Sequence, residues 1–73
     1  MSINELVKQK RKAAKLTQPE LAEKAGVGYR FVRELEMGKD TLRLDKVNQV
    51  LKLFGYEVGP VLIKRNTELD EKG

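Results

Sequence analysis

The chain has 73 residues and a formal net charge of +4, and it contains neither cysteine nor histidine. This composition excludes disulfides, thiol nucleophiles, imidazole bases and conventional zinc sites, and leaves only lysine to activate an aliphatic hydroxyl. The length suits one domain with a small core. There is no apolar run long enough to span a bilayer and no leader-like segment. We therefore expect a cytoplasmic, non-enzymatic domain with no cofactor and no metal, whose positive charge suits a polyanionic partner.

The first predicted helix begins at Ser2. A serine hydroxyl caps free amides, and Glu5, three residues on, reaches back to the cap. Apolar residues recur at helical spacing up to a stop before Thr17. Basic residues crowd this helix: Lys8, Lys10, Arg11, Lys12 and Lys15. Such a cluster by itself decorates a solvated face, but beside a DNA-binding motif it would supply a field that faces phosphates.

Two short helices joined by a glycine turn follow. Thr17 and Glu20 form a second capping pattern, and Gly26 ends the helix in a position that favours a left-handed backbone. The next helix starts at Gly28 and ends at Gly38. This arrangement is typical of a helix-turn-helix, although small helical bundles also contain such hairpins.

A fourth helix is predicted after the polar loop at residues 39–41, closed by Gly55. We expect the side chain of Phe31 to pack beneath its own helix rather than to reach DNA. The predicted core is Leu6, Val7, Leu16, Leu21, Ala22, Ala25, Val27, Val32, Leu35, Leu42, Leu44, Val47, Val50, Leu51 and Phe54.

Four motifs invite comparison with known families: Leu16-Thr17-Gln18, Glu20-Leu21-Ala22, Ala25-Gly26-Val27 and Leu35-Glu36-Met37-Gly38-Lys39. They resemble lambda-repressor-like helix-turn-helix domains of the xenobiotic-response-element (XRE) type, over residues 3–55. The run from residue 30 to residue 51 is most similar to HipB-type antitoxins. The resemblance implies an all-α, compact bundle of four to five helices that acts as a homodimeric, autoregulating repressor, with double-stranded DNA and a HipA-type kinase toxin as partners.

Base recognition is assigned to the start of the second helix of the motif, which enters the major groove in helix-turn-helix proteins. The candidates are Gly28, Tyr29, Arg30, Arg33 and Glu34. An arginine can grip guanine O6 and N7 with both arms of its guanidinium. Tyr29 can contact a thymine methyl or a phosphate, and Glu34 can accept from cytosine or orient an arginine.

Phosphate contacts follow from the resemblance. It assigns them to Gln18 at the start of the preceding helix and to Lys39, Thr41 and Arg43 on the other side of the recognition helix. Gly28 and Met37 depart from the family pattern, which has a small hydroxyl residue and a polar or basic residue at these two places. Both departures weaken the DNA contacts expected there.

Arg11 has two interpretations, as a phosphate contact or as a structural residue. In the resembled family an arginine at this place pairs with the glutamate that corresponds to Glu36. We favour the structural pair, because a partly buried arginine and glutamate are costly unless they meet.

The chain divides into a DNA-binding domain at 1–55, a dimerisation strand at 56–64 and a flexible tail at 65–73. The strand prediction follows from alternating and β-branched residues, with a proline that is tolerated only at an edge. Its best partner is the same strand of a second subunit, as in HipB-type antitoxins; the alternative is packing on its own core. The expected dimerisation residues are Tyr56, Val58, Val61, Leu62 and Ile63.

Three functions remain in competition. The first is a repressor and antitoxin that binds a pseudo-palindromic operator. The second is a plain phage or chromosomal repressor without a toxin. The third is a protein-interaction module on a helix-turn-helix scaffold, supported only by bulky Tyr29 and Phe31 and the uncapped Gly28.

Overall fold

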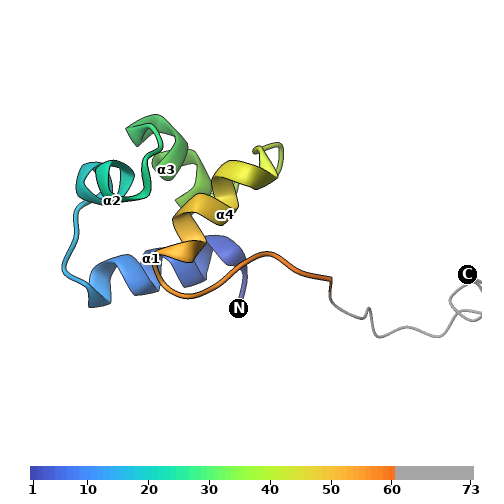
Figure 1. The fold of residues 1–73 in the computed structure, drawn as a ribbon, viewed down its shortest axis with the longest axis horizontal. Helices are drawn as coiled ribbons and strands as arrows, with labels where there is room; N and C mark the ends of the chain where they lie inside the picture. Colours follow the sequence, from blue (N-terminus) through green and yellow to red (C-terminus); the bar gives the residue numbers. More distant parts are fainter. Residues whose placement is uncertain (61–73) are drawn as a thin grey trace, which may run out of the picture.

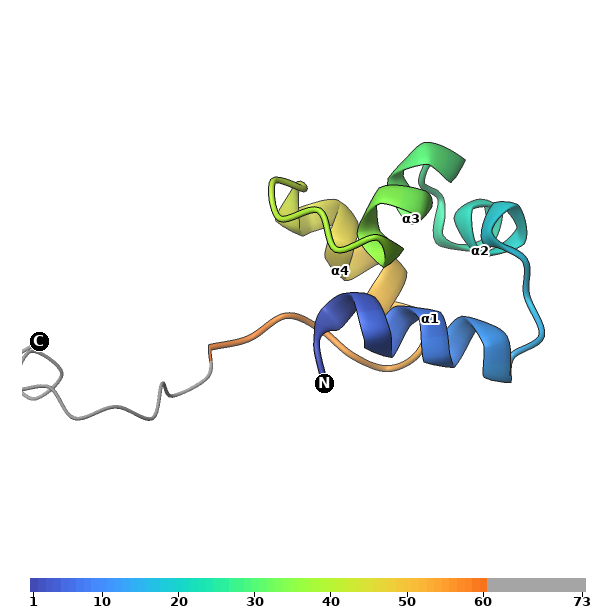
Figure 2. The same cartoon turned by 180° about the vertical axis from the view of Figure 1, so that it is seen from behind.

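The computed structural model describes residues 1–60, and this part of the chain contains four helices. They are α1 (Ile3–Ala13), α2 (Gln18–Ala25), α3 (Tyr29–Glu36) and α4 (Leu44–Lys52). The α2 helix packs against α3 and α4, and α3 also packs against α1. Figure 1 shows α1 along one side of the bundle and α3 on the other, and Figure 2 shows the same arrangement from behind. The predicted all-α bundle is confirmed for these residues.

The segment after α4 does not form the predicted strand within the described residues. Residues 56–60 have no regular secondary structure. The remaining predicted strand residues, Val61, Leu62 and Ile63, and the tail at 65–73 lie outside the described residues. Strand pairing across a dimer therefore stays a prediction.

Both predicted capping boxes are present. Glu5 N–H donates to Ser2 Oγ at 3.4 Å, and Ser2 N–H donates to Glu5 Oε1 at 3.0 Å. At the start of α2, Thr17 N–H donates to Glu20 Oε1 at 2.8 Å, and Glu20 N–H donates back to Thr17 Oγ1 at 3.2 Å. Backbone hydrogen bonds from Ser2 and Thr17 lower the pKa of the two glutamates. Each box thus fixes a helix start from local sequence.

The turn between α2 and α3 depends on Gly26. Its φ is +75°, in the left-handed region where a side chain is strained. The turn that follows lets Val27 N–H donate to Ala22 O at 3.0 Å, a carbonyl at the end of α2 that also accepts from Gly26 N–H. The chain then restarts as α3 at Gly28, which offers no side-chain cap. This turn sets the short connection that defines the helix-turn-helix.

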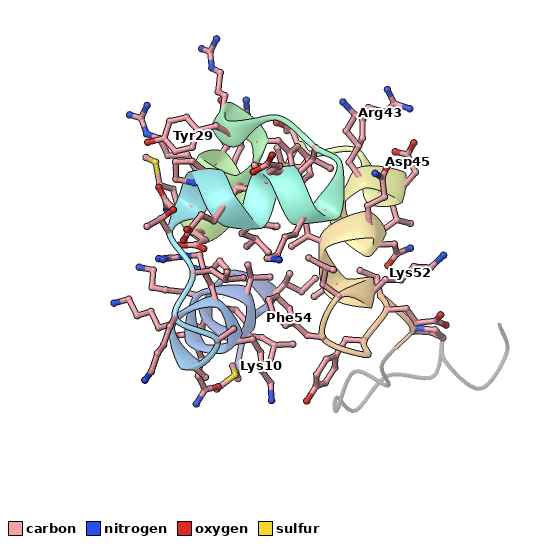
Figure 3. The ribbon with its side chains drawn as sticks, turned by 60° about the vertical axis from the view of Figure 1, so that its left-hand side comes forward. Lys10, Tyr29, Arg43, Asp45, Lys52 and Phe54 are labelled. Carbon is pink, nitrogen blue, oxygen red and sulfur yellow. The ribbon has the colours of Figure 1, made fainter. Side chains whose placement is uncertain are left out.

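The core lies where all four helices meet, and the predicted core is largely confirmed. The buried hydrophobic residues are Val7, Leu21, Ala22, Val32, Leu35, Val47, Val50 and Leu51. Phe31 is half-buried against this core as predicted, and so is Phe54, which lies between α1 and the end of α4 (Figure 3). Leu44 was wrongly placed in the core: it is 58 % exposed, because it opens α4 at the edge of the bundle. Val58, beyond the last helix, packs against the core and was missed.

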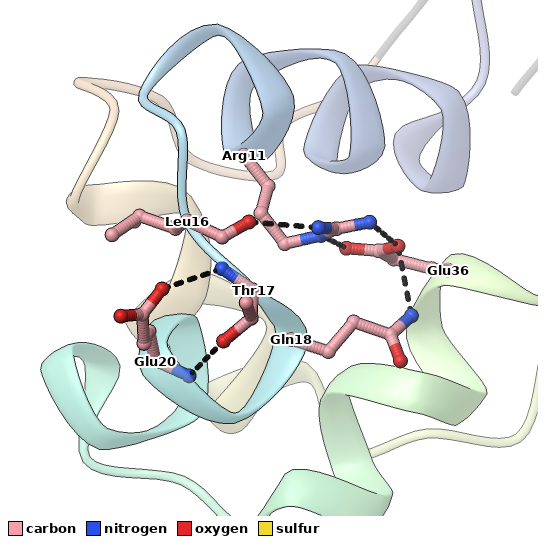
Figure 4. Close-up of polar contacts among 6 residues, drawn as sticks. All are labelled: Arg11, Leu16, Thr17, Gln18, Glu20 and Glu36. Carbon is pink, nitrogen blue, oxygen red and sulfur yellow. Dashed lines mark hydrogen bonds and ion pairs between the residues drawn. The ribbon is translucent and has the colours of Figure 1, made fainter.

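A buried ion pair joins α1 to α3. Arg11 Nε donates to Glu36 Oε2 at 2.6 Å and Arg11 Nη2 donates to Glu36 Oε1 at 3.0 Å (Figure 4). The third arm of the guanidinium donates to Leu16 O at 2.8 Å, and Gln18 Nε2 donates to Glu36 Oε1 at 3.0 Å. The Glu36 side chain is only 1 % exposed and that of Arg11 is 12 % exposed. The structural interpretation of Arg11 therefore describes what this side chain does in the fold.

The partners of Glu36 favour the ionised form of its carboxyl group. Burial acts to raise the pKa of this carboxyl, but hydrogen bonds from Arg11 and Gln18, with the charges of Arg11 and Lys8, outweigh burial and lower the pKa. The same pair raises the pKa of Arg11. A carboxylate whose folded pKa is depressed adds stability above its unfolded pKa and loses that contribution as the pH falls through its folded pKa.

Replacing Gly26 by alanine should lower the free energy of unfolding by about 1–2 kcal/mol, because alanine is strained in a left-handed backbone. Urea denaturation followed by circular dichroism measures this difference. Gly59→Ala is the matched control: nothing lies within 4 Å of an added Cβ there, and no positive φ occurs. Equal stability of the two variants would contradict the role given to Gly26.

Arg11→Ala should lower the free energy of unfolding by about 3–5 kcal/mol, because it leaves the Glu36 carboxylate buried without its main partner. The control is Lys12→Ala, an exposed basic residue one position along the same helix. We expect the salt dependence of DNA binding to change less than the stability. A normal melting temperature combined with a shallower salt dependence would instead make Arg11 a phosphate contact.

Acid should destabilise the protein partly through Glu36. The stability that this carboxylate adds is complete above its ordinary pKa of 4.5 and is lost below it, as the pH falls through the lower folded pKa. The stability difference between the wild type and Glu36→Gln should therefore shrink as the pH is lowered below 4.5. Urea denaturation over a pH series measures it, and a pH-independent difference would contradict this account.

Candidate nucleic-acid interface

The exposed face of α3 carries most of the predicted base-contacting residues. Tyr29 is 47 % exposed and the Arg30 side chain is 88 % exposed. Arg33 is exposed as well, one helical turn further on. The opposite face of the same helix enters the core through Val32 and Leu35. Packing of that apolar stripe therefore turns the arginines outward, where a DNA groove could receive them.

A shallow hollow of about 170 Å³ lies on this face, lined by Arg30, Arg33, Glu34 and Met37. These residues share one face because they are three or four positions apart on a helix. Met37 is 73 % exposed. Its apolar side chain weakens the polar DNA contact expected at this place, and its position beside the arginines gives this exposed face of α3 an apolar end.

Glu34 lies between two cations. Its Oε2 is 3.6 Å from Arg30 Nε and 3.4 Å from Lys39 Nζ. Its side chain is 29 % exposed, less than those of its partners, so the carboxylate sits beneath them. Of the two roles considered for Glu34, this geometry suits the orientation of an arginine. Such exposed ion pairs add little stability, but they restrict where the two cations can go.

The loop from α3 to α4 places the predicted backbone contacts at the edge of this face. Lys39, Thr41 and Arg43 are all exposed. Arg43 is the N-cap residue of α4 and donates from Nη2 to Asp45 Oδ2 at 2.7 Å, a hydrogen bond that lowers the pKa of Asp45. Tyr29 and Arg43 lie on the same side of the molecule, away from Lys10 (Figure 3). Lys39 and Arg43 would therefore lie beside a duplex that is bound against α3.

Gln18 opens α2, as expected, but its side chain has a structural partner. The amide donates to Glu36 at 3.0 Å, so one of its two protons is used within the fold. The other proton is free to reach a phosphate, since a primary amide carries two donors. The sequence alone gave no indication of this link.

The basic residues of α1 do not form the single phosphate-facing field that we expected. Arg11 turns inward to Glu36. The Lys10 ammonium lies 5.5 Å from the centre of the Tyr56 ring, on the side opposite Tyr29. A helix that packs against its neighbours spreads adjacent residues over several directions, so a cluster in sequence is not one surface.

Neither a metal site nor a membrane-crossing element emerges from residues 1–60. Among these residues no group of three or more acidic side chains could hold a metal ion. No helix in this part of the chain has the length and hydropathy to cross a membrane.

Comparison with known proteins agrees with this geometry. Residues 7–60 match the model of a helix-turn-helix family. The chain is 48 % identical over 56 residues to an uncharacterized HTH-type transcriptional regulator, y4mF, of Sinorhizobium fredii (strain NBRC 101917 / NGR234), covering 77 % of this chain and 74 % of that protein. No solved structure matches the chain. The match covers α2, α3, α4, the turn between α2 and α3 and the part of α1 from residue 7 onward, and the chain belongs to this helix-turn-helix family.

Proposed function

We propose that this protein is a sequence-specific DNA-binding transcriptional repressor. One observation carries the proposal: α3 presents Arg30 and Arg33 on an exposed face, with Lys39 and Arg43 at its edge. Membership of the helix-turn-helix family and the similarity to a protein described as an HTH-type transcriptional regulator support it.

Recognition would combine two kinds of contact. Arg30 and Arg33 reach base edges in the major groove, where a bidentate arginine–guanine pair discriminates by roughly 1–3 kcal/mol. Tyr29 and Gly28, at the start of α3, approach the same edges. Gln18, Lys39, Thr41 and Arg43 hold the phosphates on either side and set the register without reading sequence. Occupation of a promoter by such a complex would block transcription.

The repressor would act as a homodimer on a pseudo-palindromic operator, with half-sites about one helical turn apart. Residues 56–64 are the proposed dimerisation segment, with 1–55 as the DNA-binding domain and 65–73 as a flexible tail. The apolar character of Val61, Leu62 and Ile63 supports this division. The backbone hydrogen-bonding groups of such a strand are best paired with those of a second subunit.

A narrower proposal is an antitoxin of the HipB type that represses its own operon and binds a HipA-type kinase toxin. Its support is the resemblance of residues 30–51 and the apolar C-terminal segment. Co-expression with the product of any adjacent kinase-like gene, followed by affinity purification, tests it. Without such a gene or complex, the protein would be a plain repressor.

DNA binding is tested by fluorescence anisotropy with the DNA upstream of this protein's own gene, against scrambled DNA. We expect tight, saturable binding to the upstream DNA and a loss of about 10³-fold or more between 50 and 200 mM salt, because released counterions drive phosphate contacts. Equal, weak binding to both, with no sequence enriched from a random duplex pool, would contradict the proposal. Retention of a protein partner in that case would favour an interaction module.

Alanine variants separate the two kinds of contact. Arg30→Ala and Arg33→Ala should each weaken the free energy of binding to the operator by roughly 1–3 kcal/mol and relax the preference for a guanine. Lys39→Ala should weaken operator and scrambled DNA alike and make the salt dependence shallower. Lys52→Ala is the matched control, since Lys52 lies away from Tyr29 and Arg43 (Figure 3). Equal losses on both DNAs for the arginine variants would remove them from base recognition.

A further inference from the structure

An apolar groove lies on the opposite end of the domain from the α2–α3 turn. Its volume is about 240 Å³, and it runs between the start of α1, the α3–α4 loop and the start of α4. The apolar residues that line it are Ile3, Leu35, Leu42, Leu44, Val47 and Val58. Two of them are open to solvent, since Ile3 is 40 % and Leu44 is 58 % exposed. Exposed apolar surface gathered around a hollow is typical of a site that another chain covers.

The chain itself leads to this groove. After α4, Tyr56 lies against Lys10, and Val58 N–H donates to Asn48 Oδ1 at 2.8 Å. These contacts hold residues 56–58 against the domain and place the Val58 side chain in the groove wall. The start of the C-terminal segment is therefore fixed beside the groove.

The residues that follow have the chemistry to fill it. Gly59 and Pro60 are followed by three consecutive apolar residues, Val61, Leu62 and Ile63. Both views of the ribbon show the chain leading away from the helices at residues 59–60 (Figures 1 and 2). The exit direction favours the groove of a second copy over that of the same chain.

We propose that Val61–Ile63 of a second copy packs into the groove lined by Ile3, Leu44 and Val58, reciprocally in a two-fold dimer. The proposal deepens the repressor function and rests on its dimer. The four steps along the chain from Val58 to Leu62 span at most about 14 Å, so both grooves lie near the two-fold axis. One self-complementary contact then fills both grooves, as closed symmetry requires.

The size of the groove supports a peptide occupant. Small-molecule sites usually enclose roughly 300–1,000 Å³, and this groove is smaller and open. Its lining is mostly apolar and includes the polar residues Asn4, Lys39 and Asp40. An apolar centre with a polar rim is the usual anatomy of a protein–protein contact.

Sedimentation equilibrium of the full chain tests the groove. Leu44→Glu should raise the dimer dissociation constant by about tenfold or more, because it puts a charge where Leu62 would pack. The matched control is Leu53→Glu, since Leu53 is 43 % exposed but does not line the groove. We expect it to stay within about twofold of the wild type. A wild type that is monomeric at every concentration, or equal effects of the two substitutions, would overturn the proposal.

Cross-linking decides which chain supplies the segment. The protein has no cysteine, so single Leu44→Cys and Leu62→Cys chains carry one thiol each. A mixture of the two, one of them tagged, should oxidise to a mixed disulfide dimer, and Leu53→Cys mixed with Leu62→Cys should form far less. A further variant carries Leu44→Cys and Leu62→Cys in one chain. If a disulfide forms only within that chain, the segment packs into the groove of its own chain and the proposal fails.

These experiments contain no DNA. The groove proposal fails on the oligomeric state or the cross-links of the free protein, whereas the DNA-binding proposal fails on the binding of the upstream DNA. A failure of the repressor function would appear in the anisotropy measurement, with the dimer unaffected.

Discussion

The buried ion pair between Arg11 and Glu36 fixes α1 against α3. It joins α1 to the end of the recognition helix, while the same guanidinium holds the carbonyl of Leu16 and the same carboxylate receives the amide of Gln18. Three of the four helices in residues 1–60 thus meet at one carboxylate. Burying a charge is expensive, and here the cost is offset because several donors surround it. An error in any one partner would leave the others unpaired.

This network also helps to position the exposed face of α3. Glu36 ends α3 and Gln18 starts α2, so the hydrogen bond between them helps to set the spacing of these two helices. The arginines on the exposed face of α3 gain precision from that rigid support rather than from their own ion pairs, which are exposed and weak. In the proposed complex, base recognition would thereby depend on Arg11 and Glu36, whose side chains are buried within the fold.

The end of the domain that carries the apolar groove leaves hydrophobic side chains uncovered. Ile3 and Leu44 stay exposed around the groove, although both are large hydrophobic residues in helices. A domain of this size has little apolar surface to spare, so a second chain that covers the groove would add stability that the monomer lacks. Dimer formation and correct spacing of two recognition helices would then be one event.

Local sequence determined the helix starts and the turn, because a capping box or a left-handed glycine acts within a few residues: Thr17 with Glu20, and Gly26, are where the pattern predicts them. Helical periodicity also placed most of the core, with Leu44 as the error at a helix end. Tertiary structure decided the rest. Gln18 on Glu36 and Val58 in the groove join segments that lie far apart in the sequence, which no local pattern records. Their directions depend on how the helices cross, which is set only when the core packs.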